Sequence, residues 1–272
     1  QTLPLKATYL FNWGLEYLVK CCGCSALLCT ATQPCLDKIG ENRYRLHIDG
    51  EVIVDLAEHF NALKRVRFID KTAGGTKKHS AADIASYIQN EMKTHNSFLA
   101  VVNTKPQAKE LFELIDESGC ADYVYHLSTN MCPAHRNEIL NHIKAELKKG
   151  IKILLVSTAL IEAGVDISFA GVIRSLAGLD VIIQAAGRCN RNGEMTVGKV
   201  WIVAVSKDAE NISKLKSLVI AQQALRPILD HFNDEPEKYE SSIMSTLMLE
   251  KYFFNYYKAI DMLSYQRRKK LK

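Results

Sequence analysis

Strands and helices alternate along most of this 272-residue chain, and this alternation limits the fold more than any other feature. Short apolar runs rich in Val, Ile and Leu are separated by longer segments whose apolar residues recur at helical spacing. Such runs, without a polar face, are typical of parallel strands that helices cover on both faces. The expected strands are 65–69, 98–102, 123–127, 151–156, 171–174 and 199–205, and the expected helices are 80–94, 106–117, 134–148 and 179–189. The pattern predicts an α/β fold with one parallel sheet between two layers of helices.

The segments on either side of this region have a different pattern. Residues 6–20 are expected to form a helix, 24–30 an apolar strand, and 42–54 an extended, exposed connection. Beyond residue 207 the pattern is helical to the end, with a turn at Asn233-Asp-Glu-Pro236. The expected domains are therefore 1–64, 65–207 and 208–272.

The expected strand 151–156 ends in two hydroxyl side chains, Ser157 and Thr158. In an open parallel sheet, ligands bind outside the carboxyl ends of the strands. Hydroxyl groups at that position donate hydrogen bonds to phosphate, and such contacts carry no base information. The loop that follows carries Glu162, Gly164 and Asp166. Far upstream, the strand 24–30 also ends in hydroxyl groups, at Thr30 and Thr32.

An arginine pair follows the last expected helix of the middle region. In the run Gln184-Ala-Ala-Gly187-Arg188-Cys-Asn-Arg191, the two arginines are three residues apart, which puts them on one face if the helix continues. Guanidinium groups bind phosphate oxygens bidentately and stay charged at any working pH. In NTPases, arginine fingers of this kind contribute a factor of roughly 10³–10⁵ in rate. Taken alone, the pair also fits a surface salt bridge.

The order of these pieces resembles the superfamily 2 helicases, whose motors are two RecA-like lobes with ATP between them and nucleic acid across the top. Thr30-Ala-Thr32 is similar to their motif III, Ser157 to Asp166 is similar to motif V, and Gln184 to Arg191 is similar to motif VI. Four stretches are similar, more narrowly, to the CRISPR-associated helicase–nuclease of type I interference systems: Thr30 to Pro34, His126 to Arg136, Leu160 to Ile167 and Gln184 to Arg191. The resemblance covers nearly the whole chain, with Gln1 at or just after that family's DExH/Q box.

The resemblance implies three groups of site residues. Contacts to single-stranded DNA are expected from Asn103, Thr104, His126, Ser128, Arg136, Ser157 and Thr158. Residues expected at the ATP pocket are Gln184, Arg188 and Arg191 in catalysis, with Glu162, Gly164, Asp166 and Gly187 in nucleotide binding. Coupling between the lobes is expected from Thr30, Thr32 and Gln33. For His126 and His135, a helix-cap or surface role is an equal alternative.

A motor of this kind also needs a phosphate loop, Gly-x-x-x-x-Gly-Lys-Ser/Thr, and an acidic box for Mg²⁺. The nearest match, Gly193 to Lys199, continues with Val200 where the loop needs a hydroxyl, and an apolar strand follows where a helix belongs. It is therefore interpreted as a turn into the next strand. We expect ATP and Mg²⁺ to be held mainly by a first lobe, and residues 1–64 to be a remnant of that lobe.

Charge and cysteine usage add little to the motifs. The net charge is +5, but residues 251–272 hold seven Lys and Arg against one Asp, so the rest is nearly neutral. Aromatic residues interleave with this basic tail, which suits either a nucleic-acid contact or a packing helix, and we expect the packing helix. The eight cysteines lack zinc-site spacing, so we expect no metal and free thiols that pack in strand and helix. No apolar run is long enough for a membrane span, so we expect a cytoplasmic protein.

The most specific interpretation is the second motor lobe of an ATP-dependent, 3′-to-5′ single-stranded DNA helicase. By the resemblance, its partners are the first RecA-like lobe, a nuclease domain and a CRISPR RNA-guided surveillance complex, with which it unwinds and degrades invading DNA. Two alternatives remain open from the residues alone. One is a lobe of a DExH-group RNA helicase, because backbone contacts do not separate DNA from RNA. The other is a non-catalytic module that binds nucleic acid without turning over ATP.

Overall fold

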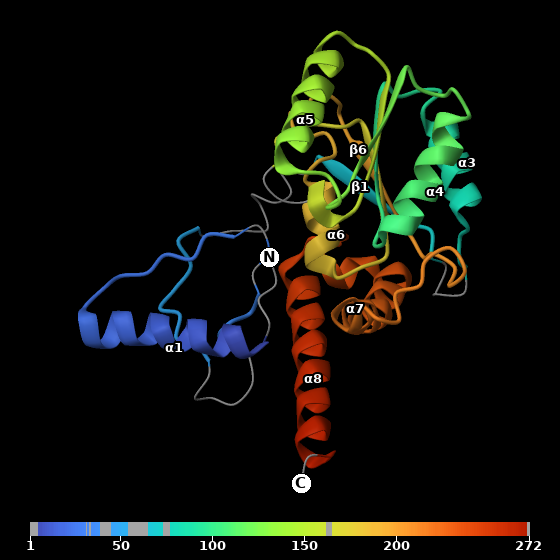
Figure 1. Cartoon of the computed structure of the whole chain (residues 1–272). Helices are drawn as coiled ribbons and strands as arrows, with labels where there is room; N and C mark the ends of the chain where they lie inside the picture. Colours follow the sequence, from blue (N-terminus) through green and yellow to red (C-terminus); the bar gives the residue numbers. More distant parts are fainter. Residues whose placement is uncertain are drawn as a thin grey trace. The chain divides into compact units, whose positions relative to one another are not determined.

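The computed structural model describes residues 5–30, 32, 34–38, 45–53, 65–72, 77–161 and 165–270. The chain divides into two compact units, one of residues 64–219 and one that joins residues 1–63 to 220–272 (Figure 1). Within the described part of the chain, no helix is long and apolar enough to cross a membrane.

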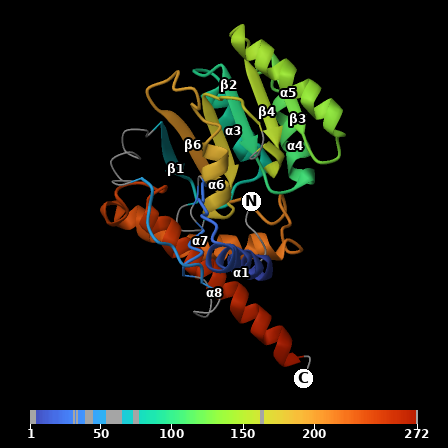
Figure 2. The same ribbon diagram turned by 90° about the vertical axis from the view of Figure 1, so that its left-hand side faces the viewer.

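The larger unit is built on a parallel sheet. Its described residues form six strands, β1 (Val66–Asp70), β2 (Ser97–Val101), β3 (Tyr123–Leu127), β4 (Ile153–Ser157), β5 (Gly171–Ser175) and β6 (Gly198–Val203). The strands lie in the order β1-β6-β5-β2-β4-β3, and every neighbouring pair is parallel (Figure 2). Each predicted strand of this region is present, so the predicted parallel α/β sheet is confirmed.

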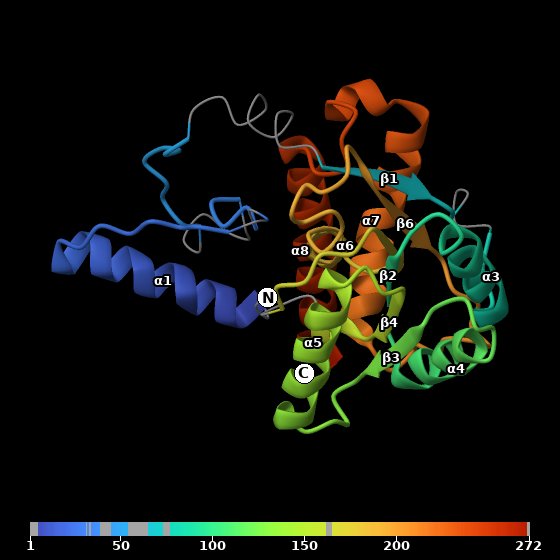
Figure 3. The ribbon, with the colours of Figure 1, turned by 90° about the horizontal axis from the view of Figure 1, so that it is seen from above.

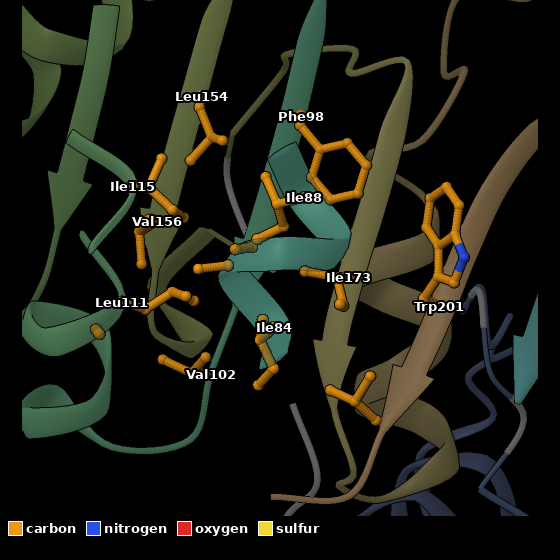
Figure 4. Close-up of a cluster of buried hydrophobic side chains, with 14 of the residues drawn as sticks. Ile84, Ile88, Phe98, Val102, Leu111, Ile115, Leu154, Val156, Ile173 and Trp201 are labelled. Atoms are coloured by element: carbon orange, nitrogen blue, oxygen red, sulfur yellow. The ribbon is translucent and has the colours of Figure 1, made fainter. Parts of the chain in front are cut away.

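Helices cover both faces of the sheet (Figure 3). Successive side chains of a strand point to opposite faces. In β2, Phe98 and Ala100 pack with α3 (Ala81–Glu91) and α4 (Lys105–Asp116), as the close-up of this cluster shows (Figure 4). Leu99 and Val101 point to the other face, where they pack with α5 (Pro133–Lys148) and α6 (Leu179–Ala186). This two-sided burial explains why the strand sequences are apolar throughout.

Local signals set the starts of these helices. Ser80 caps α3 in a capping box, in which its hydroxyl accepts the Asp83 N–H and the Asp83 carboxylate accepts the Ser80 N–H. Both α4 and α5 carry a proline in the first turn, where the missing N–H has no helical partner anyway. These starts lie within one residue of the predicted ones.

The smaller unit is mainly helical, with α1 (Leu5–Cys22), α8 (Thr246–Lys270) and most of α7 (Lys216–Asp234). A short 3₁₀ turn (Pro236–Tyr239) follows α7 at the predicted turn. On α8, Tyr252 stacks on Tyr256 and Phe253 on Tyr257, and all four rings are buried. The packing-helix interpretation is confirmed for these residues. The side chains of Tyr265 and of the Arg267–Lys270 run lie outside the described part.

The predicted strand at 24–30 is wrong. Residues 23–30 have no regular secondary structure, and Leu27 is 72% exposed. A strand needs a neighbour to satisfy its backbone N–H and C=O groups. No described strand lies beside this segment, so its apolar sequence alone does not make it a strand. Residues 45–53 have no regular secondary structure, and they are largely exposed, as predicted.

Candidate functional site

The carboxyl ends of β2, β4 and β3 meet at one edge of the sheet. Val101 and Leu127 both pair with Ser157, so the three strands end in one row. Backbone hydrogen bonds continue past this row, from the Val102 N–H to the Ser157 carbonyl (2.9 Å) and from the Thr158 N–H to the Leu127 carbonyl (3.4 Å). This edge carries four of the residues that are predicted to contact single-stranded DNA: Asn103, Ser128, Ser157 and Thr158.

The hydroxyl groups at this edge differ in how far they reach solvent. Ser157 is fully buried, and its hydroxyl donates to the Thr158 carbonyl over 3.0 Å. Ser128 is 2% exposed and Thr158 is 9% exposed. Of the three, Thr158 is therefore the best placed to meet a ligand in solvent.

Asn103 is held by two buried charged residues that the motifs did not indicate. Its side-chain oxygen accepts a hydrogen bond from the Arg174 guanidinium (2.7 Å), and its side-chain nitrogen donates to a Glu210 carboxylate oxygen (2.9 Å) and to the Leu176 carbonyl (3.1 Å). Burial raises the pKa of Glu210, although the N–H groups of Asn103 oppose this. The sequence offered one signal for Arg174, because an arginine stands inside the otherwise apolar strand 171–174. No sequence feature pointed to Glu210.

The residues after Asn103 begin α4. Thr104 is its N-cap residue, and its hydroxyl makes no capping hydrogen bond. Lys105 reaches from the first turn to the Asn130 side chain, which accepts from its ammonium group over 2.6 Å. Both side chains are partly or fully exposed, so this loop presents a hydroxyl and a cation to solvent.

His126 and Arg136 lie near the same edge but are partly covered. The His126 ring lies 5.8 Å from the Phe112 ring of α4, and burial lowers its pKa from the ordinary 6.5, which favours the neutral ring. The His126 Nε2 and Arg136 Nε atoms are buried and have no hydrogen-bond partner in the part of the chain that the structure describes. His135 is exposed on α5. The surface role therefore fits His135 and does not fit His126.

The arginine pair does not lie on a helix, which corrects the expected helix 179–189. The helix α6 ends at Ala186, and Asn190 adopts a left-handed backbone with φ 46°. Residues 188–190 instead form backbone hydrogen bonds with Phe169. The Phe169 N–H donates to the Arg188 carbonyl, and the Phe169 carbonyl accepts the Asn190 N–H, both over 2.8 Å. These hydrogen bonds replace the helical ones and stop the helix early.

The two arginines have different surroundings. Arg188 is 8% exposed and its Nε donates to the Ile161 carbonyl over 3.1 Å. Arg191 is more exposed and pairs with Asp166, with 2.7 Å between Nε and Oδ1. The hydrogen bond from Arg191 lowers the pKa of Asp166 below its ordinary value of 3.8. Both contacts join the segment after β4 to the segment after α6.

The other predicted nucleotide-side residues are less constrained. Gln184 is half-buried on α6, and Gly187 is an exposed C-cap with an ordinary right-handed φ of −62°. In the smaller unit, the Thr30 hydroxyl accepts the Thr32 N–H (3.3 Å) and donates to the Thr32 carbonyl (3.1 Å), which forms a local turn. Gln33, Glu162 and Gly164 lie outside the described residues.

The Gly193 to Lys199 stretch is a turn into a strand, as predicted. Gly193 has a positive φ of 71°, and β6 starts at Gly198. Lys199 lies within β6, paired with Gly171 of β5, and its ammonium group is 3.5 Å from Glu91. This lysine is part of the sheet and not of a phosphate loop.

The cysteines only partly follow the prediction. Burial raises the pKa of Cys35 and of Cys189 to about 12, so both are packed, unreactive thiols. Cys21, Cys22, Cys24, Cys29 and Cys132 are exposed, so the expected packing is wrong for them. Cys24 and Cys29 lie in the segment that does not form the expected strand.

Comparisons with known proteins show similarity to one family. Residues 94–194 match the family described as CRISPR-associated nuclease/helicase Cas3, C-terminal. A CRISPR-associated nuclease/helicase Cas3 of Haloferax volcanii is 39% identical over 105 residues, which are 36% of this chain and 11% of that protein.

Two solved structures have a similar fold. The crystal structures of T. fusca Cas3 with ADP and with ATP match with TM-scores of 0.52 and 0.50, at 16% and 15% identity. The matches cover 75% and 74% of this chain and 27% of each T. fusca chain. The chain thus spans about a quarter of these structures and about a tenth of the curated relative. The matched segment, the relative and the fold thus make this chain similar to the C-terminal helicase region of CRISPR-associated Cas3 proteins.

Proposed function

We propose that this chain supplies the second motor lobe of an ATP-dependent helicase that moves 3′-to-5′ along single-stranded DNA. The observation that carries the proposal is the pair of contacts from Arg188 to Ile161 and from Arg191 to Asp166, which join the motif V and motif VI segments. The row of strand ends lies at the carboxyl edge of the same sheet. One lobe thus offers one surface for a nucleotide and a separate surface for single-stranded DNA.

On the nucleotide side, Arg191 is the residue best placed to reach a phosphate. Its guanidinium is partly exposed, whereas Arg188 is buried and bound to the Ile161 carbonyl. Asp166 is already paired with Arg191, and we assign Mg²⁺ to the first lobe. ATP supplies the phosphoanhydride bond whose hydrolysis drives the motor. We assign Gln184, Gly187, Glu162 and Gly164 to the same pocket.

The smaller unit supports the need for a first lobe. On α1 the polar residues Thr8 and Asn12 are buried, while Leu10, Trp13 and Tyr17 are 68%, 53% and 62% exposed. Asn12 donates to the Leu36 carbonyl over 3.0 Å, which fixes this orientation. A helix that exposes its apolar face needs a further surface to cover it. We assign that surface to the first RecA-like lobe, with Thr30, Thr32 and Gln33 coupling the lobes.

The wider machine is part of the proposal. The Haloferax relative is named a nuclease/helicase, and this chain covers only a small part of it. We therefore propose that the nuclease domain and a CRISPR RNA-guided surveillance complex are partners of the full-length protein. In that setting the motor unwinds invading DNA for degradation.

Binding of a labelled oligonucleotide, measured by fluorescence anisotropy across a salt series, tests the strand surface. The logarithm of the binding constant for single-stranded DNA is expected to fall linearly with the logarithm of the salt concentration. The slope is roughly −0.7 for each phosphate that a cationic side chain neutralises. Arg136→Ala is expected to weaken binding and flatten the slope, whereas Thr158→Val weakens binding at an unchanged slope because no charge is lost. Equal or tighter binding of an RNA strand of the same sequence favours an RNA helicase.

The arginines are tested in the full-length enzyme. Arg188→Ala and Arg191→Ala are each expected to lower ATP turnover by on the order of 10²-fold or more while strand binding is kept. Lysine at either position is expected to restore little, because a point charge does not reproduce the bidentate fork. Unchanged turnover would assign that arginine a structural salt bridge, and strand binding without any ATP turnover in the wild type would assign the lobe a non-catalytic role.

A further inference from the structure

Asn103, expected to touch the DNA backbone, has no side-chain donor left for a phosphate. Both hydrogens of its amide nitrogen are used, one toward Glu210 (2.9 Å) and one toward the Leu176 carbonyl (3.1 Å). Its oxygen accepts from Arg174 at 2.7 Å. The amide orientation is therefore fixed by a cation on one side and an anion on the other.

The backbone donors at this position are occupied as well. The Glu210 carboxylate accepts the Asn103 N–H over 2.8 Å and also the Thr104 N–H. The N–H groups at a helix start have no partner within the helix and can bind an anion, often a phosphate. Here an internal carboxylate already accepts the two N–H groups just before α4, those of Asn103 and Thr104.

Arg174 and Glu210 are both almost fully buried, with 1% and 5% exposure. Buried charges are rare unless they are paired or hydrogen-bonded, and Asn103 lies between the two. The residues come from three separate parts of the chain: Arg174 from β5, Asn103 from the end of β2, and Glu210 from the segment after β6. We call these three residues the Asn103 clamp.

Two side chains next to the clamp remain available to a strand. The Thr104 hydroxyl makes no capping hydrogen bond, and Lys105 is exposed with its ammonium group on Asn130. Thr104 and Lys105, the N-cap and first residue of α4, directly follow Asn103, which the clamp fixes. The clamp therefore sets where this hydroxyl and this cation point.

We propose that Arg174 and Glu210 are positioning residues, which act through Asn103, and that Thr104 and Lys105 are the side chains that meet strand phosphates at this end of the sheet. The second half of the proposal rests on the proposed function. It assigns Asn103 a role inside the lobe in place of a direct phosphate contact.

A charge swap in the full chain tests the clamp. Asn103→Asp puts a second carboxylate against Glu210 and is expected to weaken binding of a labelled single-stranded DNA by about tenfold or more, as when a charged group loses its partner. Adding Glu210→Gln restores the donor–acceptor pair on the side of residue 210, because Asp then accepts from both Arg174 and Gln, while the Leu176 carbonyl stays without its donor. The double variant is therefore expected to recover part of the affinity. A loss that the double variant does not recover overturns the clamp.

The direct contacts have their own signature in the same salt series. Lys105→Ala is expected to weaken binding and to reduce the salt slope by about 0.7, whereas Thr104→Val weakens binding at the same slope. Glu210→Ala is expected to weaken binding, with Glu117→Ala, at the exposed far end of α4, as the control for loss of one negative charge. Tighter binding by Glu210→Ala alone would mean that Glu210 competes with phosphate, which contradicts the proposal.

Amide hydrogen exchange tests, without any nucleic acid, whether Glu210 binds the backbone N–H groups of Asn103 and Thr104. The Asn103 and Thr104 amides are expected to exchange slowly in the wild type and fast in Glu210→Ala. Fast exchange in the wild type overturns the clamp, whether or not the chain binds single-stranded DNA. Slow exchange in a wild type that binds no strand would instead refute the proposed function, and with it the Thr104 and Lys105 contacts, while the clamp stands.

Discussion

At the scale of single residues, the segment after α6 depends on Asn190. Its side chain donates to the carbonyls of Arg65 (3.1 Å) and Met195 (2.7 Å) and accepts the Met195 N–H (3.0 Å). Asparagine tolerates the left-handed backbone found here better than most residues do. Arg188 and Arg191 flank this fixed point, so their positions follow from a buried amide and not from a helix.

The pairing of Arg191 with Asp166 predicts a pH effect. Because the folded pKa of Asp166 is depressed, its contribution to stability is present above the unfolded pKa, near 3.8, and is lost as the pH falls through the lower folded value. Arg191→Ala is expected to return the pKa of Asp166 toward its ordinary range, as measured by NMR titration of the carboxyl carbon. Arg188→Ala, which removes a weaker and more distant influence, is the control. An unchanged titration in Arg191→Ala would contradict the ion pair.

Gly198 gives a second prediction at this scale. A Cβ there would lie 2.6 Å from the Cys189 sulfur and 2.9 Å from the Asn190 Cβ. Gly198→Ala is therefore expected to lower the free energy of unfolding by about 1–3 kcal/mol through overpacking. Gly14→Ala, in the open middle of α1, is the matched control and is expected to be neutral or stabilising by up to about 1 kcal/mol. Denaturant unfolding measures both, and adding Cys189→Ala should recover part of the Gly198→Ala loss.

At the scale of elements, α3 and α4 start in different ways although they pack on the same face of the sheet. Ser80 caps the first turn of α3 with its own side chain, whereas the N-cap residue of α4, Thr104, makes no side-chain capping hydrogen bond. Instead, the backbone N–H groups of Asn103 and Thr104, just before α4, donate to the distant Glu210.

This contrast can be measured as a difference in stability. Ser80→Ala removes a capping hydrogen bond and is expected to lower the free energy of unfolding by about 1 kcal/mol. Thr104→Ala removes no capping hydrogen bond and is expected to change it by less than about 0.5 kcal/mol. Chemical denaturation of the two variants gives the comparison. Equal losses would show that Thr104 caps α4 in solution.

At the scale of the whole molecule, the sheet and its two helical layers form one lobe, while α1 and the segment after it expose apolar side chains. The chain spans about a quarter of the T. fusca Cas3 structures to which it is similar. Both facts bear on what the isolated chain can do.

The isolated chain is accordingly expected to hydrolyse ATP no faster than background, because the phosphate loop and metal ligands of such motors belong to the first lobe. Supplying that lobe, in cis or as a separate fragment, is expected to restore DNA-stimulated turnover. A coupled phosphate-release assay measures both states. Rapid ATP turnover by the purified chain alone would contradict the proposal that this chain supplies only the second motor lobe.

The sequence by itself determined the parallel sheet, the helices on its two faces and the edge at which the polar residues gather. These follow from apolar periodicity and from residues a few positions apart, which are local signals. Tertiary structure decided the rest. It ended α6 early, left 24–30 without a neighbour among the described strands, and enclosed Asn103 between partners 71 and 107 residues away. Hydrogen bonds over such separations leave no periodic trace in a sequence, so which polar groups are already bound, and which remain free for a ligand, is fixed only when the chain is folded.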